Sequence, residues 1–221
     1  VFDVVKAGNS SPIGALTSIS GLTLLQRTIF ALQCGGISQI LTLVGEEEKS
    51  LRSLIQNDDR IQATIRWLPT REFPPSDAQT WATLASDLKG SCLILSCHMV
   101  FSPSLIESLR EEAHDGQAVI AIGCPGDEKW KANPGVFIHA DPNLSGLSQQ
   151  VVFHDPSGIS SEPTGRLISG LSPVTDLIVL PIRLLGVSGA WKTQDFGPIR
   201  LALEQAAAEG VIKTISISSQ N

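Results

Sequence analysis

The sequence predicts an α/β protein built on a doubly wound, mainly parallel sheet. Three observations lead to this class. Strand-like and helix-like segments alternate over about the first 125 residues, the strands are short continuous apolar runs, and Gly or Pro marks most boundaries. Continuous apolar runs are typical of strands that helices cover on both faces. A later section rich in Pro, Gly, Asp and Asn predicts a β-excursion before the closing elements.

The first half of the chain is predicted to hold five strands with helices between them. The strands are expected at residues 1–5, 37–45, 62–68, 91–96 and 117–123. The helices are expected at residues 21–36, 46–56, 76–88 and 102–116. Gly35–Gly36 end the first helix, Ser76 or Asp77 caps the third, and Ser102 caps the fourth with Pro103 in its first turn.

The second half breaks this alternation and then resumes it. Two short strands, at 135–140 and 149–154, are expected between turns, followed by a buried strand and short helix at 172–185. A helix at 195–210 and a strand at 211–218 close the pattern. The chain stops directly after that strand, which indicates a fragment of a longer protein.

Composition narrows the class further. The chain has 221 residues, 42% of them apolar, enough for one large α/β domain with its own core. Its formal net charge of −6 gives no basic surface for nucleic acid. With no apolar run of membrane-spanning length and no signal-peptide pattern, we expect a cytoplasmic protein. The four scattered cysteines, without a C-x-x-C pair, predict reduced thiols.

The segment CLILSCHMV places two chemically active residues where a predicted strand ends. In α/β sheets, ligands bind just outside the carboxyl ends of the strands, so Cys97 and His98 are candidate site residues. A nucleophile–base pair is one interpretation, but adjacent residues leaving a strand point in opposite directions. A place in a ligand or metal region is the other interpretation.

Three segments early in the chain and three late in it match a known family in their order. The early ones are VVKAGNSSPIG, ISGLTLLQRTIFALQCGGISQILTLVG and CLILSCHMVFSPSLIESL, and the late ones are TDLIVLP, IRLALEQAAAEG and VIKTISIS. Together they resemble the nucleotidyltransferase family, which includes sugar-phosphate nucleotidylyltransferases and the molybdopterin-cofactor guanylyl- and cytidylyltransferases. The nearest resemblance is to the cytidylyltransferase domain found fused to CDP-alcohol phosphotransferases.

This resemblance implies a single domain, residues 1–221, with a Rossmann-like fold of the nucleotide-diphospho-sugar transferase type. Residues 1–123 would be its nucleotide-binding half, and residues 124–221 the β-excursion and closing elements. The implied reaction joins a nucleoside triphosphate, with CTP as first candidate, to an alcohol phosphate or sugar phosphate and releases pyrophosphate. A membrane phosphotransferase domain beyond Asn221 is the implied partner, which would tether the full-length protein to a membrane.

The loop after the first strand is the part of the family site that survives best. Five residues correspond to an A-G-x-G-[ST] pattern whose backbone N–H groups would hold the triphosphate, with serine in place of the second glycine. They are Ala7, Gly8, Asn9, Ser10 and Ser11. Pro12 stands where the resemblance implies an arginine, and no lysine occurs near Gly14, where one is implied.

The metal site departs from the family pattern more strongly. The resemblance implies an aspartate that holds Mg²⁺ where this chain has Cys97, followed by His98. Cysteine is a soft ligand and a poor partner for Mg²⁺. A second metal carboxylate is implied beyond the last strand of this chain, and Asp176 stands where a glycine is implied to contact the second substrate.

These departures leave three hypotheses open. The chain is a nucleotidyltransferase that uses Mg²⁺, or a domain of the same fold that has lost catalysis and binds or regulates, or a domain of this fold with an unrelated ligand. Absence of an arginine, a lysine and a metal carboxylate favours weak or lost activity, because each phosphate-neutralising group contributes about 10²–10³ in rate. Trp67, Trp81 and Trp130 either stack on a base or pack in the core.

Overall fold

The computed structural model describes most of the predicted α/β core. The described residues are 14–75, 77–95, 97, 100–113, 116–123, 135–139, 150–154, 171–185, 202–203, 205–206 and 208–217. Several predictions lie outside them, among them the strand at 1–5, the loop at 7–11, and much of the helix at 195–210.

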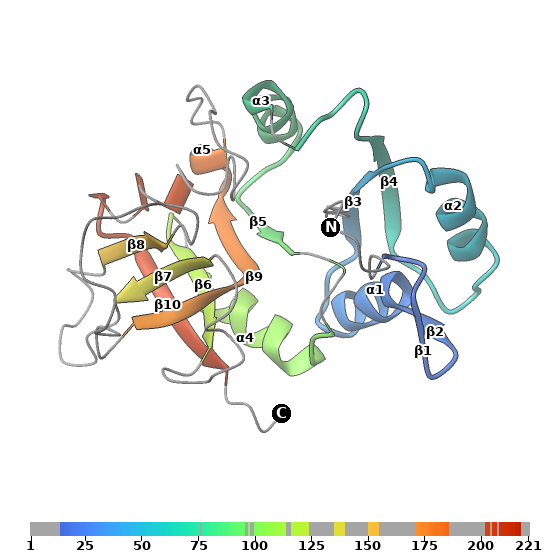
Figure 1. The fold of residues 1–221 in the computed structure, drawn as a ribbon, viewed down its shortest axis with the longest axis horizontal. Helices are drawn as coiled ribbons and strands as arrows, with labels where there is room; N and C mark the ends of the chain where they lie inside the picture. The colour runs from blue at the N-terminus through green and yellow to red at the C-terminus, as the bar shows by residue number, and fades with distance from the viewer. Residues whose placement is uncertain are drawn as a thin grey trace.

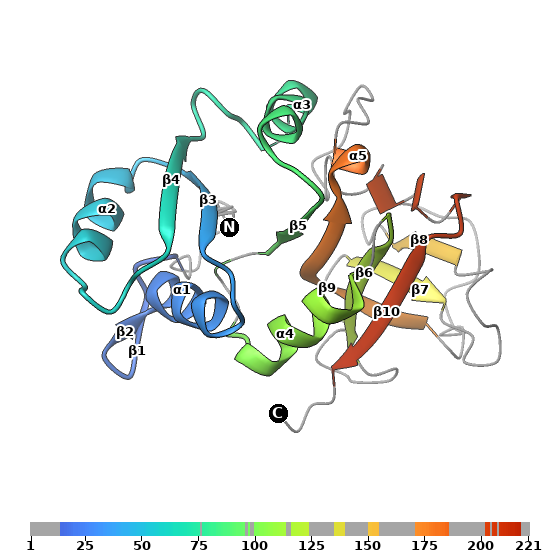
Figure 2. The same cartoon turned by 180° about the vertical axis from the view of Figure 1, so that it is seen from behind.

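A six-stranded sheet forms the centre of the described structure (Figure 1). Its strands are β5 (Ser91–Ile94), β6 (Ala118–Gly123), β7 (Gly135–His139), β8 (Gln150–His154), β9 (Leu171–Pro181) and β10 (Ile212–Ile217). The order is β10-β6-β9-β7-β8, with β5 also paired to β9. β10 runs parallel to β6, as Figure 2 shows from behind, whereas β9 is antiparallel to β5, β6 and β7.

A parallel pair of strands, β3 (Gln39–Val44) and β4 (Thr64–Pro69), belongs to the first half of the chain. The helices of the first half are α1 (Leu24–Cys34), α2 (Glu48–Gln56), α3 (Ala78–Asp87) and α4 (Pro103–Glu112), and α5 (Ile182–Leu185) follows β9. Strands and helices therefore alternate as predicted over the first half.

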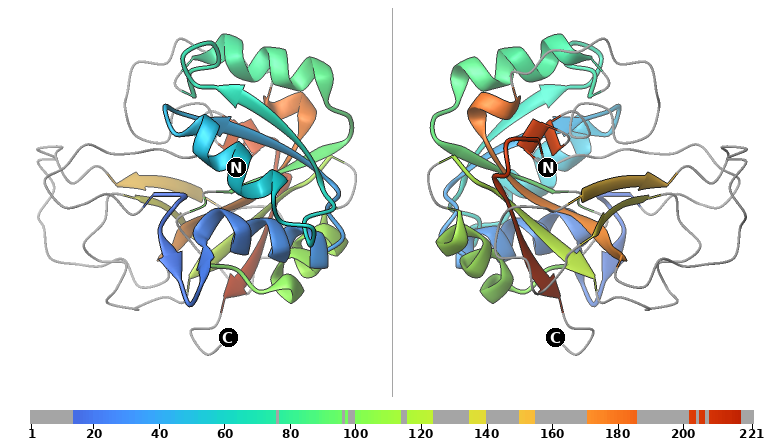
Figure 3. Two further views of the ribbon diagram at one scale, coloured as in Figure 1. Left: turned by 90° about the vertical axis from the view of Figure 1, so that its right-hand side faces the viewer. Right: turned by 90° about the vertical axis from the view of Figure 1, so that its left-hand side faces the viewer.

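The apolar core consists of two clusters, one on each face of the sheet. Neighbouring residues of β6 show the division: Ile120 packs with residues of α3 and α5, and Ala121 packs with residues of α1, α2 and α4. Successive side chains of a strand point to opposite faces, so both faces of β6 are covered. Figure 3 shows the same arrangement, with α3 and α5 on one side of the strands and α1 and α4 on the other. This is the doubly wound α/β architecture.

Local signals account for the starts of α3 and α4 and for the end of α1. The Asp77 side chain accepts a hydrogen bond from the backbone of α3, and the Ser102 hydroxyl accepts one from α4, as their sequence positions predict. Gly36 adopts φ +81° directly after α1, and a Cβ on Gly35 would lie 2.5 Å from Ile106 of α4. The two glycines thus end α1 and let it approach α4 closely.

The start of α1 differs from the prediction, which began the helix at residue 21. Residues 18–23 instead form a hairpin of β1 (Ser18–Ile19) and β2 (Leu22–Thr23). Its two turn residues, Ser20 and Gly21, have φ of 49° and 80°, the backbone that two-residue hairpin turns require. Thr23 then caps α1 in a capping box with Gln26, which fixes the true first turn.

Among the described residues, no helix combines the length and the apolar character needed to cross a membrane.

Candidate functional site at the carboxyl ends of the strands

The pairing of β5 with β9 brings two predicted site residues to one edge of the sheet. The two strands are antiparallel, and Ile94 of β5 pairs with Ile178 of β9. The chain that continues beyond Ile94 therefore passes the residues that precede Ile178. The carboxyl end of β5, which Cys97 follows, thus lies beside the middle of β9, where Asp176 stands.

Asp176 lies in an irregular part of β9. Successive pairs between β6 and β9 leave residues 175–177 of β9 opposite the single residue Ala121, and the register shifts there. Such bulges bend a strand and are frequent beside active sites. The backbone of Asp176, the residue predicted to adjoin the second substrate, therefore lies at this irregularity within the pairing of β6 with β9.

Cys97 is buried rather than presented to solvent. It is 1% exposed and packs in the apolar cluster that includes Leu95, Phe101 and Ile106. A soft thiol in an apolar cluster does not fit Mg²⁺, which requires hard oxygen ligands. In the part of the chain that the structure describes, no three His, Cys, Asp or Glu side chains come together in a way that could hold a metal ion.

His98 and the loop residues Ala7, Gly8, Asn9, Ser10 and Ser11 lie outside the described residues, as does Pro12. Their predicted roles in nucleotide binding and in the metal region stay predictions.

Gly14 is the first described residue after the predicted phosphate loop. Its N–H donates a hydrogen bond to the Thr17 hydroxyl (3.1 Å), which forms a tight turn before the hairpin. A Cβ at Gly14 would lie 4.0 Å from Oε2 of Glu47, which is exposed after β3. Among the described residues, a carboxylate thus lies beside the position where the family resemblance implies a lysine.

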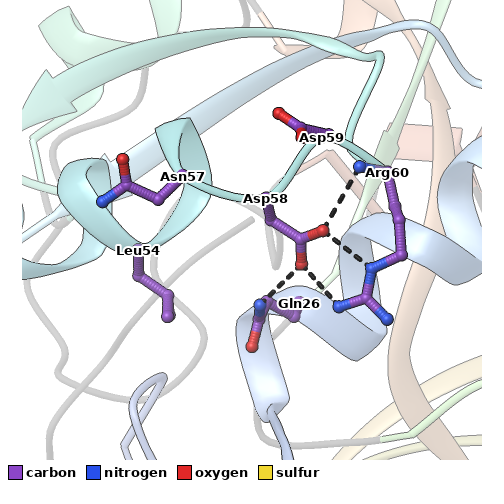
Figure 4. Close-up of a pocket in the computed structure, with 6 residues that line it drawn as sticks. All are labelled: Gln26, Leu54, Asn57, Asp58, Asp59 and Arg60. Carbon is purple, nitrogen blue, oxygen red and sulfur yellow. Dashed lines mark hydrogen bonds and ion pairs between the residues drawn. The ribbon is translucent and has the colours of Figure 1, made fainter.

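A shallow depression elsewhere on the surface has polar walls (Figure 4). Its lining residues are Gln26, Leu54, Asn57, Asp58, Asp59 and Arg60. Sequence reasoning did not single out this place, because its contacts join segments about 30 residues apart and follow no short motif.

Asp58 is at the centre of this depression. Its carboxylate accepts hydrogen bonds from Nε and Nη2 of Arg60, both at 2.8 Å, from the Arg60 backbone N–H, and from Nε2 of Gln26 at 2.8 Å. The Arg60 side chain, followed by its backbone N–H and the Gln26 amide, lowers the pKa of Asp58 to about 2 against the opposing effect of desolvation. These donors already occupy the carboxylate oxygens of Asp58. We therefore assign this group of residues a structural role and not a ligand-binding one.

One face of α1 contacts the chain segment that joins α2 to β4. Gln26 holds Asp58, the Phe30 ring lies 5.0 Å from the Arg60 guanidinium, and Gln33 holds residues 60–63. These three helical residues are spaced by four and three, so they share one face. We call residues 58–63 the α2–β4 strap. It fixes α1 against the amino end of β4.

Two of the three tryptophans named as base-stacking candidates are described. Trp81, on the buried face of α3, is 4% exposed, belongs to an apolar core cluster, and donates its indole N–H to the Pro75 carbonyl (2.8 Å). Trp67 is half-buried, with the Arg52 guanidinium 5.6 Å from its ring centre. Core packing is therefore the role of Trp81; Trp130 lies outside the described residues.

Comparison with known proteins identifies the fold. No protein-family model and no curated protein matches this sequence. Among solved structures, the chain is similar to the inositol-1-phosphate CTP transferase from T. maritima, with 13% identity, a TM-score of 0.62, and coverage of 96% of this chain and 80% of that one.

Two further structures support the same assignment. The 4-diphosphocytidyl-2C-methyl-D-erythritol synthase from Anaerococcus prevotii has 14% identity, a TM-score of 0.58, and coverage of 92% and 83%. A UDP-glucose pyrophosphorylase complexed with UDP-glucose has 13% identity, a TM-score of 0.61, and coverage of 89% and 79%. The chain has the α/β fold of the nucleotide-diphospho-sugar transferases. At these identities, the likeness establishes the fold alone.

Proposed function

We propose that this chain is a nucleotide-binding domain with the nucleotidyltransferase fold whose transferase activity is weak or lost. The single observation that carries the proposal is the burial of Cys97, 1% exposed, where the family resemblance implies a metal-binding aspartate. The similar structures act on or bind nucleotide compounds by their names, which supports a nucleotide as the class of ligand.

The nucleotidyl-transfer reaction that the family resemblance implies requires groups that this chain does not have at the corresponding positions. A phosphate oxygen of an alcohol phosphate or sugar phosphate attacks the α-phosphorus of a nucleoside triphosphate, with CTP as first candidate, and pyrophosphate leaves. Positive groups must stabilise the charge that builds on the phosphoryl oxygens. At the corresponding positions this chain has Pro12, Gly14 and Cys97, and Glu47 lies beside Gly14. None of these three residues supplies a hard oxygen ligand for Mg²⁺ or a positive charge for the phosphoryl oxygens.

An active transferase is the second candidate, supported by the retained order of elements and by the bulge at Asp176, which would adjoin the second substrate. In that case Mg²⁺ would be the cofactor. A non-catalytic domain could instead regulate an attached CDP-alcohol phosphotransferase, and this partner stays a prediction.

The test is release of pyrophosphate. The purified chain would be incubated with Mg²⁺, each of the four common nucleoside triphosphates, and a panel of sugar and polyol phosphates that includes inositol 1-phosphate. We expect no release above that of a heat-denatured control. Release that depends on one triphosphate and one phosphorylated substrate would contradict the loss of activity and support the enzyme.

A further inference from the structure

One end of the six-stranded sheet is a strand that meets a neighbour on one side. The order β10-β6-β9-β7-β8 places β8 last, and among the described residues it pairs with β7 alone. In Figure 3 this strand, coloured amber, projects away from the helices. An edge strand presents backbone N–H and C=O groups that can pair with another chain. The outer edge of β8 is therefore a candidate interaction surface.

β8 lacks the residues that protect other edge strands of this molecule. Proteins commonly guard a sheet edge with charged residues, lysine above all, or with proline. β10, at the opposite end of the sheet, carries Lys213, which is exposed and pairs with Glu112 of α4. β4, which pairs with β3, carries the exposed Arg66 and ends at Pro69. The sequence of β8, QVVFH, contains no lysine, arginine, carboxylate or proline.

The pairing of β8 with β7 matches residues by polarity. Three apolar residues of β8 stand opposite three apolar residues of β7. These pairs are Val151 with Ile138, Val152 with Phe137 and Phe153 with Val136. At the end of the ladder, Gln150 stands opposite His139. Cross-strand pairs of aromatic and β-branched residues stabilise antiparallel strands, so this register suits the sequence.

A second β8 would make matches of the same kind on the outer edge. The strand has five residues, with an apolar centre and a polar residue at each end. Two antiparallel copies centred on Val152 therefore match at every position. Val152 stands opposite its own copy, Val151 stands opposite Phe153, and Gln150 stands opposite His154. A twofold axis through the centre relates two such strands, and twofold symmetry is the commonest in homo-oligomers.

We propose that β8 is an interaction surface for a second copy of this chain. The two β8 strands pair antiparallel about Val152 and join the two sheets into one. Both copies use the same surface, so the contact closes as a dimer. Five residues on each side make a smaller contact than the standard interface of a stable complex, so the dimer should dissociate on dilution. It does not depend on the nucleotide binding proposed above.

The molar mass of the native chain is the first measurement. Light scattering after size-exclusion chromatography would be recorded over a range of concentrations up to the solubility limit. The mass should rise from that of one chain to that of two as the concentration increases. The mass of one chain at every concentration would overturn the proposal.

Two double variants test the antiparallel register. In Gln150→Lys with His154→Lys, each new lysine would face a lysine of the second copy, and the two repulsive pairs should weaken the dimer. In Gln150→Lys with His154→Glu, each lysine would face a glutamate, and the dimer should be retained. The dissociation constants of the two variants should differ by about tenfold, because like charges directly opposite destabilise and opposite charges stabilise. Added salt should reduce this difference.

Both variants keep the three apolar positions of β8, and circular dichroism would verify that they fold. Gln56→Lys, at an exposed glutamine on α2, is the matched control and should leave the dissociation constant of the native dimer unchanged. Equal dissociation constants for the two double variants would overturn the proposal, and so would a native dimer that neither variant affects. An equal loss in the control would do the same, because it would reveal a general effect of charge.

Discussion

At the scale of single residues, burial decides what Cys97 can do. The residue follows β5 at the edge where ligands bind in this fold, yet its thiol packs among apolar side chains. An aspartate with the same side-chain direction would place a carboxylate in that cluster. A functional metal ligand at this position would therefore need a different local chain path as well as a different residue.

Cys97→Asp should destabilise the protein without creating a metal site. Placing a charged carboxylate in this buried apolar cluster lowers the free energy of unfolding by about 3 kcal/mol. Urea denaturation with and without Mg²⁺ would measure the change. Cys34→Asp, at an exposed cysteine, is the matched control and should shift stability by about 0.5 kcal/mol or less. Stability equal to that of the native chain, or recovered by Mg²⁺, would show that position 97 faces a solvated site.

Asp58 should make stability depend on acid pH. Its pKa in the folded protein is about 2, below the ordinary value of 3.8, mainly because of Arg60. A depressed carboxyl pKa contributes stability that is fully present above pH 3.8 and is lost as the pH falls towards 2. Thermal melts between pH 5 and 2 should therefore fall less steeply for Asp58→Asn than for the native chain.

Asp59→Asn is the matched control for this profile. It removes a neighbouring carboxylate that does not take part in the paired hydrogen bonds between Asp58 and the Arg60 guanidinium, which we call the Arg60 fork. If both variants gave the native pH profile, the fork would contribute nothing to stability.

At the scale of elements, the α2–β4 strap shows how one helix organises a loop. Oε1 of Gln33 accepts the N–H groups of Gln62 (2.7 Å) and Ala63 (2.8 Å), and Nε2 donates to the Arg60 carbonyl at 3.2 Å. A single side chain thus satisfies three backbone groups just before β4 begins. This tie sets where β4 starts and how α1 lies beside it.

Gln33→Ala should loosen the strap. Loss of these hydrogen bonds should reduce the free energy of unfolding by about 1–2 kcal/mol. Amide hydrogen exchange at residues 62 and 63 should also become faster. Gln33→Glu retains both acceptor contacts and should lose less protection than the alanine variant. If amide hydrogen exchange at residues 62 and 63 were unchanged in Gln33→Ala, the Gln33 side chain would not be what protects these two N–H groups.

Sequence reasoning reached the elements whose signals are local. Caps at Asp77 and Ser102 are carried by a side chain and the helix turn beside it, so they could be predicted. The hairpin before α1 was missed because the apolar residues Leu22 and Leu24 also suit a helix. Its decisive signal was the Ser20–Gly21 pair, which accepts positive φ.

The candidate site was predictable in part. An apolar run followed by Cys97 located the end of β5, and the approach of β9 to it follows from pairings that single-sequence patterns do not contain. Burial of Cys97 could not be predicted, because side-chain direction is no longer fixed once a strand has ended. The proximity of Glu47 to Gly14 depends on the packing of two separate loops, which no local pattern encodes.

At the scale of the whole molecule, the two-sided core holds an architecture shared with enzymes that handle nucleotides. Apolar clusters on both faces of the central strands leave the strand ends as the natural place for a ligand. Among the described residues, the chain after β5 carries the buried thiol of Cys97, and the chain after β3 carries the exposed carboxylate of Glu47. Binding without transfer is the function that this combination supports.

Titration calorimetry of the native chain with nucleotides tests this account most directly. The mono- and triphosphates of cytidine, guanosine, adenosine and uridine would each be titrated with and without Mg²⁺. The account predicts that nucleotides of one base bind with one-to-one stoichiometry and that binding does not require Mg²⁺. Failure of every nucleotide to bind a folded chain, or binding only in the presence of Mg²⁺, would contradict it.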